Sequence, residues 1–140
     1  LNARKNERIE GDPRSHPVWR DVDAAMIATR RLVKIAHETG KAVRWRIARR
    51  DGRPMGIAGL WGVWRAPDGR DVLSFTMLTI NADGHEVFQR FHRPGDEKRM
   101  VVILDEADFD AWLECPLERA MSFMQRYPAQ LLEAHPDPRR

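Results

Sequence analysis

Apolar and polar residues alternate along three consecutive stretches in the middle of the chain. The residues from Arg44 to Ala48 alternate charged with apolar side chains, as expected of a half-buried strand. Asp51-Gly52 is a turn signal before a second apolar stretch, Met55 to Trp64, so the pattern predicts a hairpin. Pro67-Asp68-Gly69 marks the next turn, before a third stretch, Val72 to Ile80. Together these strands predict an antiparallel meander.

Further elements follow the meander. The residues from Met100 to Leu104 are all apolar and rich in Val, Ile and Leu, which is typical of a fully buried strand at the centre of a sheet. Residues 84–91 have the pattern of a short helix. Asp105 is placed to cap the next helix, and Pro116 suits the first turn of another. The predicted fold class is therefore α+β, a mostly antiparallel sheet, made of a meander and a buried strand, with flanking helices.

The segment from Trp19 to His37 has a different pattern. It contains no Pro or Gly, and its apolar residues recur at helical spacing. Asp21 suits an N-cap and Gly40 a helix stop. The local pattern thus favours an amphipathic helix.

The length of 140 residues is that of one domain with a single core. We assign residues 1–134 to this domain, and residues 135–140, which are rich in Pro, Asp and Arg, to a disordered tail. There is no run of about 18 apolar residues and no signal-peptide pattern. The default expectation is a soluble, cytoplasmic protein with no membrane partner.

Positive charge is concentrated in the first half of the chain. Residues 1–70 hold 16 Lys or Arg against 8 Asp or Glu, whereas residues 71–140 hold 8 against 13. Such asymmetry suits binding to a polyanion, with an affinity that falls as salt rises. A plain solvated basic surface is the alternative interpretation.

Metal and disulfide chemistry are not indicated. Cys115 is the single cysteine, so an intramolecular disulfide is excluded, and an ordinary packed thiol is expected. His37-Glu38 lacks a second His four residues after His37, and no other His or Cys pair has ligand spacing. We therefore expect no metal and no cofactor.

Several short motifs occur in a characteristic order. Asn2-Ala3-Arg4 opens the chain, Ile57-Ala58-Gly59-Leu60-Trp61 lies in the predicted second strand, and His92 stands seven residues before Arg99-Met100 and an apolar strand. In this order the motifs resemble the signature of the SOS response-associated peptidase, or abasic-site-processing, family. The resemblance spans most of residues 2–113 and implies a domain that is incomplete at its N-terminus.

The resemblance implies a DNA-damage function. The family binds single-stranded DNA that contains abasic sites and crosslinks to it covalently, and its peptidase activity is removal of its own initiator Met. By this resemblance His92 and Asn2 are the catalytic residues, and Arg4 and Arg99 bind DNA phosphates. His85 competes with His92 for the role of active-site histidine. A surface-loop His92, and an Arg99 paired with Asp96 or Glu97, are the ordinary structural alternatives.

The chain also departs from the family pattern. Family members carry a Cys after the initiator Met, whereas this chain begins at Leu1. Where the family has a Cys-Leu-Val-Pro strand and then a Gly-aromatic-aromatic-Glu element, the chain has Leu32-Val33-Lys34-Ile35-Ala36-His37. The implied strand conflicts with the helix that the local pattern favours.

These departures leave the function open. The alternative to crosslinking is a catalytically dead remnant that binds single-stranded nucleic acid without the N-terminal Cys and the catalytic Glu. An interaction module without a DNA role is a third reading. A plain imine from a desolvated Lys, or from the Leu1 amine, remains chemically available. If the family's first strand is missing, an exposed sheet edge predicts self-association.

Overall fold

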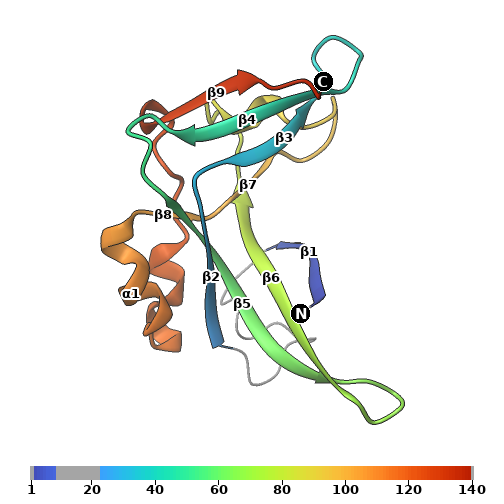
Figure 1. Ribbon diagram of the computed structural model, residues 1–140, viewed down its shortest axis with the longest axis vertical. Helices are drawn as coiled ribbons and strands as arrows, with labels where there is room; N and C mark the ends of the chain where they lie inside the picture. The colour runs from blue at the N-terminus through green and yellow to red at the C-terminus, as the bar shows by residue number, and fades with distance from the viewer. Residues whose placement is uncertain (1, 9–22, 140) are drawn as a thin grey trace.

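The computed structural model describes residues 2–8 and 23–139, and its strands form two sheets (Figure 1). Sheet A has the strand order β1-β6-β5-β2, with two short strands, β7 and β8, attached to β6 and β5. Its pairs are antiparallel except for the parallel pair β1–β6. The strands of sheet A are β1 Asn2–Arg8, β2 Asp23–Thr29, β5 Met55–Arg65, β6 Asp71–Asn81, β7 Arg99–Val101 and β8 Ile103–Leu104.

The predicted buried strand lies at the centre of sheet A. Strands β5 and β6 form a hairpin from Arg65↔Asp71 to Gly59↔Met77, and beyond that point they separate. β7 then pairs with β6, and β8 pairs with β5, so the apolar segment from Met100 to Leu104 fills the space between them. Every residue of this segment is buried. Continuous apolar character was the signal that identified it.

Gly59 lies at the point where β5 and β6 separate. A Cβ atom at this position would lie 2.5 Å from the carbonyl oxygen of Thr76 and 2.6 Å from the ring of Phe75. Because the nearest atom belongs to the backbone of β6, the neighbour cannot rotate away. The close approach of the two backbones therefore requires glycine at this position.

Sheet B has the order β3-β4-β9, with antiparallel pairing throughout. Its strands are β3 Leu32–Ala36, β4 Val43–Arg49 and β9 Leu132–Pro136. The predicted hairpin between the first two meander strands is wrong, because β4 belongs to sheet B and β5 to sheet A. The turn at Asp51-Gly52 exists, with Gly52 at a φ of 74° and Asp51 accepting from the Arg53 amide, but it joins two sheets.

The segment that was expected to be helical forms two strands. Within the described residues from 23 to 36, β2 pairs with β5 along its whole length, and β3 pairs with β4; residues 19–22 lie outside the described part. In β3, Leu32, Lys34 and Ala36 are less exposed than Val33 and Ile35. Pairing with strands distant in sequence overrides the local helical periodicity, and the strand implied by the family resemblance is the correct one.

Short helices cover part of the sheets, as Figure 1 shows for α1 beside β2. The indole of Trp112 is buried, and its Nε1 donates to the carbonyl of Ala25 in β2 at 2.8 Å. Asp105 precedes a helical turn without capping it; its carboxylate accepts from the Tyr127 hydroxyl at 2.7 Å and pairs with Arg49 at 3.2 Å. The helices are η2 Phe88–Arg90, η3 Glu106–Asp108, α1 Phe109–Leu113, η4 Leu117–Phe123 and η5 Ala129–Leu131, of which only α1 is an α-helix.

Order extends beyond residue 134. Residues 135 and 136, which we assigned to a disordered tail, form the end of β9, and the carboxylate of Asp137 pairs with Arg44 at 2.6 Å. Local composition could not reveal this strand, because it depends on pairing with β4. The α+β class itself, a mostly antiparallel sheet with flanking helices, is confirmed. No described helix has the length and apolar character needed to span a membrane.

Gly59→Ala is expected to lower the free energy of unfolding by about 1–3 kcal/mol, because the added methyl group meets the Thr76 carbonyl. Urea denaturation measures the loss. Gly56→Ala is the matched comparison, since its Cβ would meet only the side chains of Phe109 and Met26. A Gly59→Ala protein as stable as the parent would show that β5 and β6 are not held at this distance.

Candidate functional site

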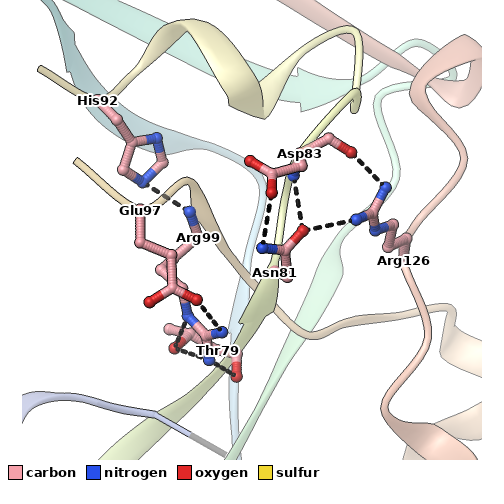
Figure 2. Close-up of polar contacts among 7 residues, drawn as sticks. All are labelled: Thr79, Asn81, Asp83, His92, Glu97, Arg99 and Arg126. Carbon is pink, nitrogen blue, oxygen red and sulfur yellow. Dashed lines mark hydrogen bonds and ion pairs between the residues drawn. The ribbon is translucent and has the colours of Figure 1, made fainter. Parts of the chain in front are cut away.

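His92 is fixed by the start of the central strand. It follows η2 and Phe91, and the loop after it turns back so that the amide of Asp96 donates to the carbonyl of Arg93. The backbone amide of Arg99, the first residue of β7, then donates to Nε2 of His92 at 2.9 Å (Figure 2). The imidazole is thereby tied to sheet A as well as to its own loop.

This hydrogen bond determines which nitrogen carries the proton. Because Nε2 accepts, the neutral ring carries its hydrogen on Nδ1. Nδ1 is buried and has no hydrogen-bond partner within the described part of the chain. Burial lowers the pKa of His92, the nearby positive charge of Lys34 lowers it further, and the backbone of Phe88 opposes the change. At neutral pH His92 is an uncharged imidazole whose Nδ1–H is buried close to the backbone of Phe88.

Arg99 contacts its neighbours with its side chain as well as its backbone. Its guanidinium donates to the carbonyl of Thr79 at 2.7 Å and to the hydroxyl of the same residue at 3.2 Å, and it pairs with Glu97 at 3.3 Å (Figure 2). The pairing with Glu97 is the structural alternative considered for this arginine. Only 19% of the Arg99 side chain is exposed, so a phosphate would meet one edge of a guanidinium that is already oriented.

His85 is a structural histidine. Its Nδ1 accepts from the amides of Val87 and Phe88, and its Nε2 lies 2.6 Å from the carbonyl of Tyr127. A neutral ring with its hydrogen on Nε2 satisfies all of these contacts, and His85 is buried. Since both of its nitrogens are occupied, His92 is the better candidate for the active-site histidine.

Asn2 and Arg4 lie on β1, whose backbone pairs with β6 on the side away from β7. Asn2 is in register with Ser74 and Arg4 with Thr76, whereas Arg99 is in register with Asn81. The side chains of Asn2 and Arg4 lie outside the described part of the structure. Of the four residues that the resemblance proposes, the described contacts bring His92 and Arg99 together.

Lys34 is the residue that sequence analysis did not assign to the site. It lies on β3 opposite Trp45, whose ring packs against that of Phe91 with 5.9 Å between centroids. Phe91 directly precedes His92, and the charge of Lys34 is the largest electrostatic influence on the His92 pKa. Burial lowers the pKa of Lys34 itself. The period-two pattern of Leu32, Lys34 and Ala36 was the signal that could have placed it on the inner face.

Much of the positive charge in the first half is neutralised locally. Arg44, Arg49, Arg65 and Arg70 each form an ion pair with an aspartate in the described structure. The numerical surplus of cations therefore overstates the charge that a polyanion would meet. Described arginines that form no ion pair would contribute most.

A second polar cluster in Figure 2 has a structural role. Arg126 donates to the carbonyl of Asp83 at 2.7 Å and to the side-chain oxygen of Asn81 at 2.8 Å. Asn81 also bonds to the amide and the carboxylate of Asp83. These contacts fasten the segment after η4 to the end of β6, next to Arg99.

The described residues contain no group of three or more His, Cys, Asp or Glu side chains that could hold a metal ion. Cys115 is buried, and its thiol donates to the carbonyl of Pro116 at 3.1 Å, as expected of a packed thiol. Glu38 is exposed and lies 3.6 Å from Arg90. No carboxylate is observed within hydrogen-bonding distance of His92 in the described structure.

The fold and the histidine–arginine loop define a class of protein. The profile of the SOS response-associated peptidase family matches residues 34–139, so the chain belongs to this family. No curated protein matches the chain significantly.

Solved structures show the same fold. A protein from Bordetella bronchiseptica is similar with a TM-score of 0.77 and 41% identity, over 82% of this chain and 55% of that one. A protein from Bacteroides thetaiotaomicron is similar with a TM-score of 0.72 and 16% identity, over 88% and 54%. A phage-related protein from B. bronchiseptica is similar with a TM-score of 0.59 and 19% identity, over 82% of this chain and 53% of that one. The chain spans about half the length of these structures.

His92 is expected to titrate below its ordinary pKa of 6.5, and NMR of its ring protons over about pH 4 to 8 measures this. Between the lowered folded pKa and the unfolded value, the unfolded chain binds more protons than the folded one. Stability should therefore be complete above pH 6.5 and fall as the pH is lowered through that interval.

His92→Gln is the control, because it identifies the resonance and should flatten this part of the pH profile. A His92 midpoint at or above 6.5 would contradict the buried, neutral imidazole.

Proposed function

We propose that the protein binds single-stranded DNA and processes abasic sites within the DNA-damage response. Family membership supports an SOS-associated, DNA-related role. Because the chain spans only about half of its structural relatives, the abasic site, the single strand and the crosslink are proposals for the whole protein.

The observation that carries the proposal is the joint placement of His92 and Arg99. An uncharged imidazole is suited to relay a proton to the oxygen released when the sugar ring of an abasic site opens. Arg99 is suited to hold an adjacent phosphate, since its planar fork is already oriented by Thr79. In this proposal one loop supplies both a proton donor and a phosphate contact, and no cofactor is needed.

Binding without covalent chemistry is the second candidate. In the family the nucleophile is an N-terminal Cys that offers both an amine and a thiol, whereas Cys115 is an interior, buried residue. Glu38, the nearest carboxylate to the missing family Glu, is turned to Arg90. In this second candidate the chain binds DNA through Arg99 without forming a thiazolidine.

A titration of fluorescent oligonucleotides tests the shared DNA-binding step. We expect the chain to bind a single strand with one abasic site, with an affinity that falls as salt rises. Arg99→Gln should reduce the salt slope by about 1 if the guanidinium neutralises one phosphate. Fluorescence anisotropy at several salt concentrations gives both quantities.

Arg126→Gln is the control, because it removes the same charge from a nearby exposed residue. Arg126 donates a hydrogen bond to the side-chain oxygen of Asn81. Equal slopes for the Arg99 and Arg126 variants would remove Arg99 from the DNA contact. No binding to single-stranded DNA at low salt would contradict the proposed function as a whole. Self-association through an edge such as β2 or β3 stays a prediction, and the oligomeric state in solution tests it.

A further inference from the structure

Lys34 and His92 form a pair of titratable groups that the family mechanism does not include. Lys34 is half-buried and makes no hydrogen bond or ion pair in the described structure, whereas Arg44, Arg49 and Arg90 each pair with a carboxylate. An unpaired amine in a partly buried position costs stability. Such a cost without a structural benefit is typical of functional sites.

The strand geometry places Lys34 opposite the aromatic residue that packs on the histidine loop. Lys34 shares the less exposed face of β3 with Leu32 and Ala36, and it lies opposite Trp45. The Trp45 ring packs on Phe91, the residue before His92. The guanidinium of Arg90 lies 4.9 Å from the centroid of the Trp45 ring, so the β3–β4 ladder and the histidine loop are packed together.

This inference rests on the function proposed above. We propose that the side-chain amine of Lys34 forms an imine with the aldehyde of an abasic sugar. The neutral Nζ attacks C1′ of the ring-opened sugar and gives a carbinolamine. The carbinolamine oxygen takes up a proton and leaves as water, and a carbon–nitrogen double bond joins Lys34 to the sugar. One amine and one aldehyde thus yield one imine and one water.

His92 is placed to assist both steps. As an uncharged imidazole, His92 can relay the proton that the attacking nitrogen loses to the C1′ oxygen, which leaves as water, so the ring is neutral before and after the step. Partial burial favours the uncharged amine that the attack requires, since it lowers the pKa of Lys34. The positive charge of Lys34 also disfavours protonation of His92 and thereby lowers the pKa of His92.

The imine is tested by reductive trapping with the full chain. The chain is mixed with a single strand carrying one abasic site, treated with borohydride, and digested, and the modified peptide is identified by mass spectrometry. We expect a reduced adduct on the peptide that contains Lys34. An oligonucleotide with a tetrahydrofuran site, which has no aldehyde, should give none.

Variants separate this inference from the function on which it rests. Lys34→Arg keeps the charge but loses the nucleophile, so it should give no adduct at this peptide, while anisotropy shows whether the abasic strand is still bound. His92→Gln should leave the adduct on Lys34 and slow its formation by about 10²-fold or more. Lys34→Met, which removes the unpaired charge, provides a folded second variant without an amine.

Each outcome has a definite meaning. An adduct that maps to the Leu1 amine or to another lysine, or one that survives Lys34→Arg unchanged, overturns the inference. Binding with no adduct at all also overturns it and leaves the DNA-binding function intact. Absence of binding to the abasic strand removes the proposed function, and the imine with it.

Discussion

The structure depends on the way that one short segment keeps two long strands apart. The amide of Val102 donates to the carbonyl of Leu78 in β6 at 3.0 Å, and its carbonyl accepts from the amide of Ala58 in β5 at 2.9 Å. A single residue therefore bridges the strands where they have separated. Because β7 begins at Arg99, these bonds also fix the amide that holds His92. The orientation of the imidazole is thus set by the hydrogen bonds of a sheet, even though the residue lies in a loop.

Burial has opposite effects on stability and on chemistry around this histidine. It leaves Nδ1 of His92 without a partner and holds Lys34 in a position where its charge is poorly solvated. An unmade hydrogen bond of this kind costs about 1–3 kcal/mol. The same desolvation lowers the pKa of both groups and so shifts each toward its uncharged form, the form that acts on a carbonyl group.

The sequence predicted those parts of the fold that depend on local signals. The apolar run from Met100 to Leu104 indicated burial, and every residue of the run is buried. The segment from 23 to 36 could not be predicted locally, because its Ala, Met and Leu residues suit a helix and only pairing with β5 and β4 makes it two strands. The separation of β4 from β5 likewise depends on β9, a partner distant in sequence.

The site was predicted unevenly for a similar reason. Ordered motifs identified His92 and Arg99, but the choice between His85 and His92 required the contacts of both rings. Lys34 carried no motif. It lies on the less exposed face of β3, opposite Trp45, because β3 is a strand. The helical interpretation of this segment did not place it there.

The late position of β9 in the chain has a consequence for biosynthesis. Sheet B is complete only when residues 132–136 pair with β4, which a ribosome makes much earlier. Until then β4 has one open edge, and the face that carries Lys34 and Trp45 is not fully supported. A nascent chain would therefore contain β4, Lys34 and Trp45 well before the strand that completes their sheet. The order of the strands along the gene separates the synthesis of this face from its assembly.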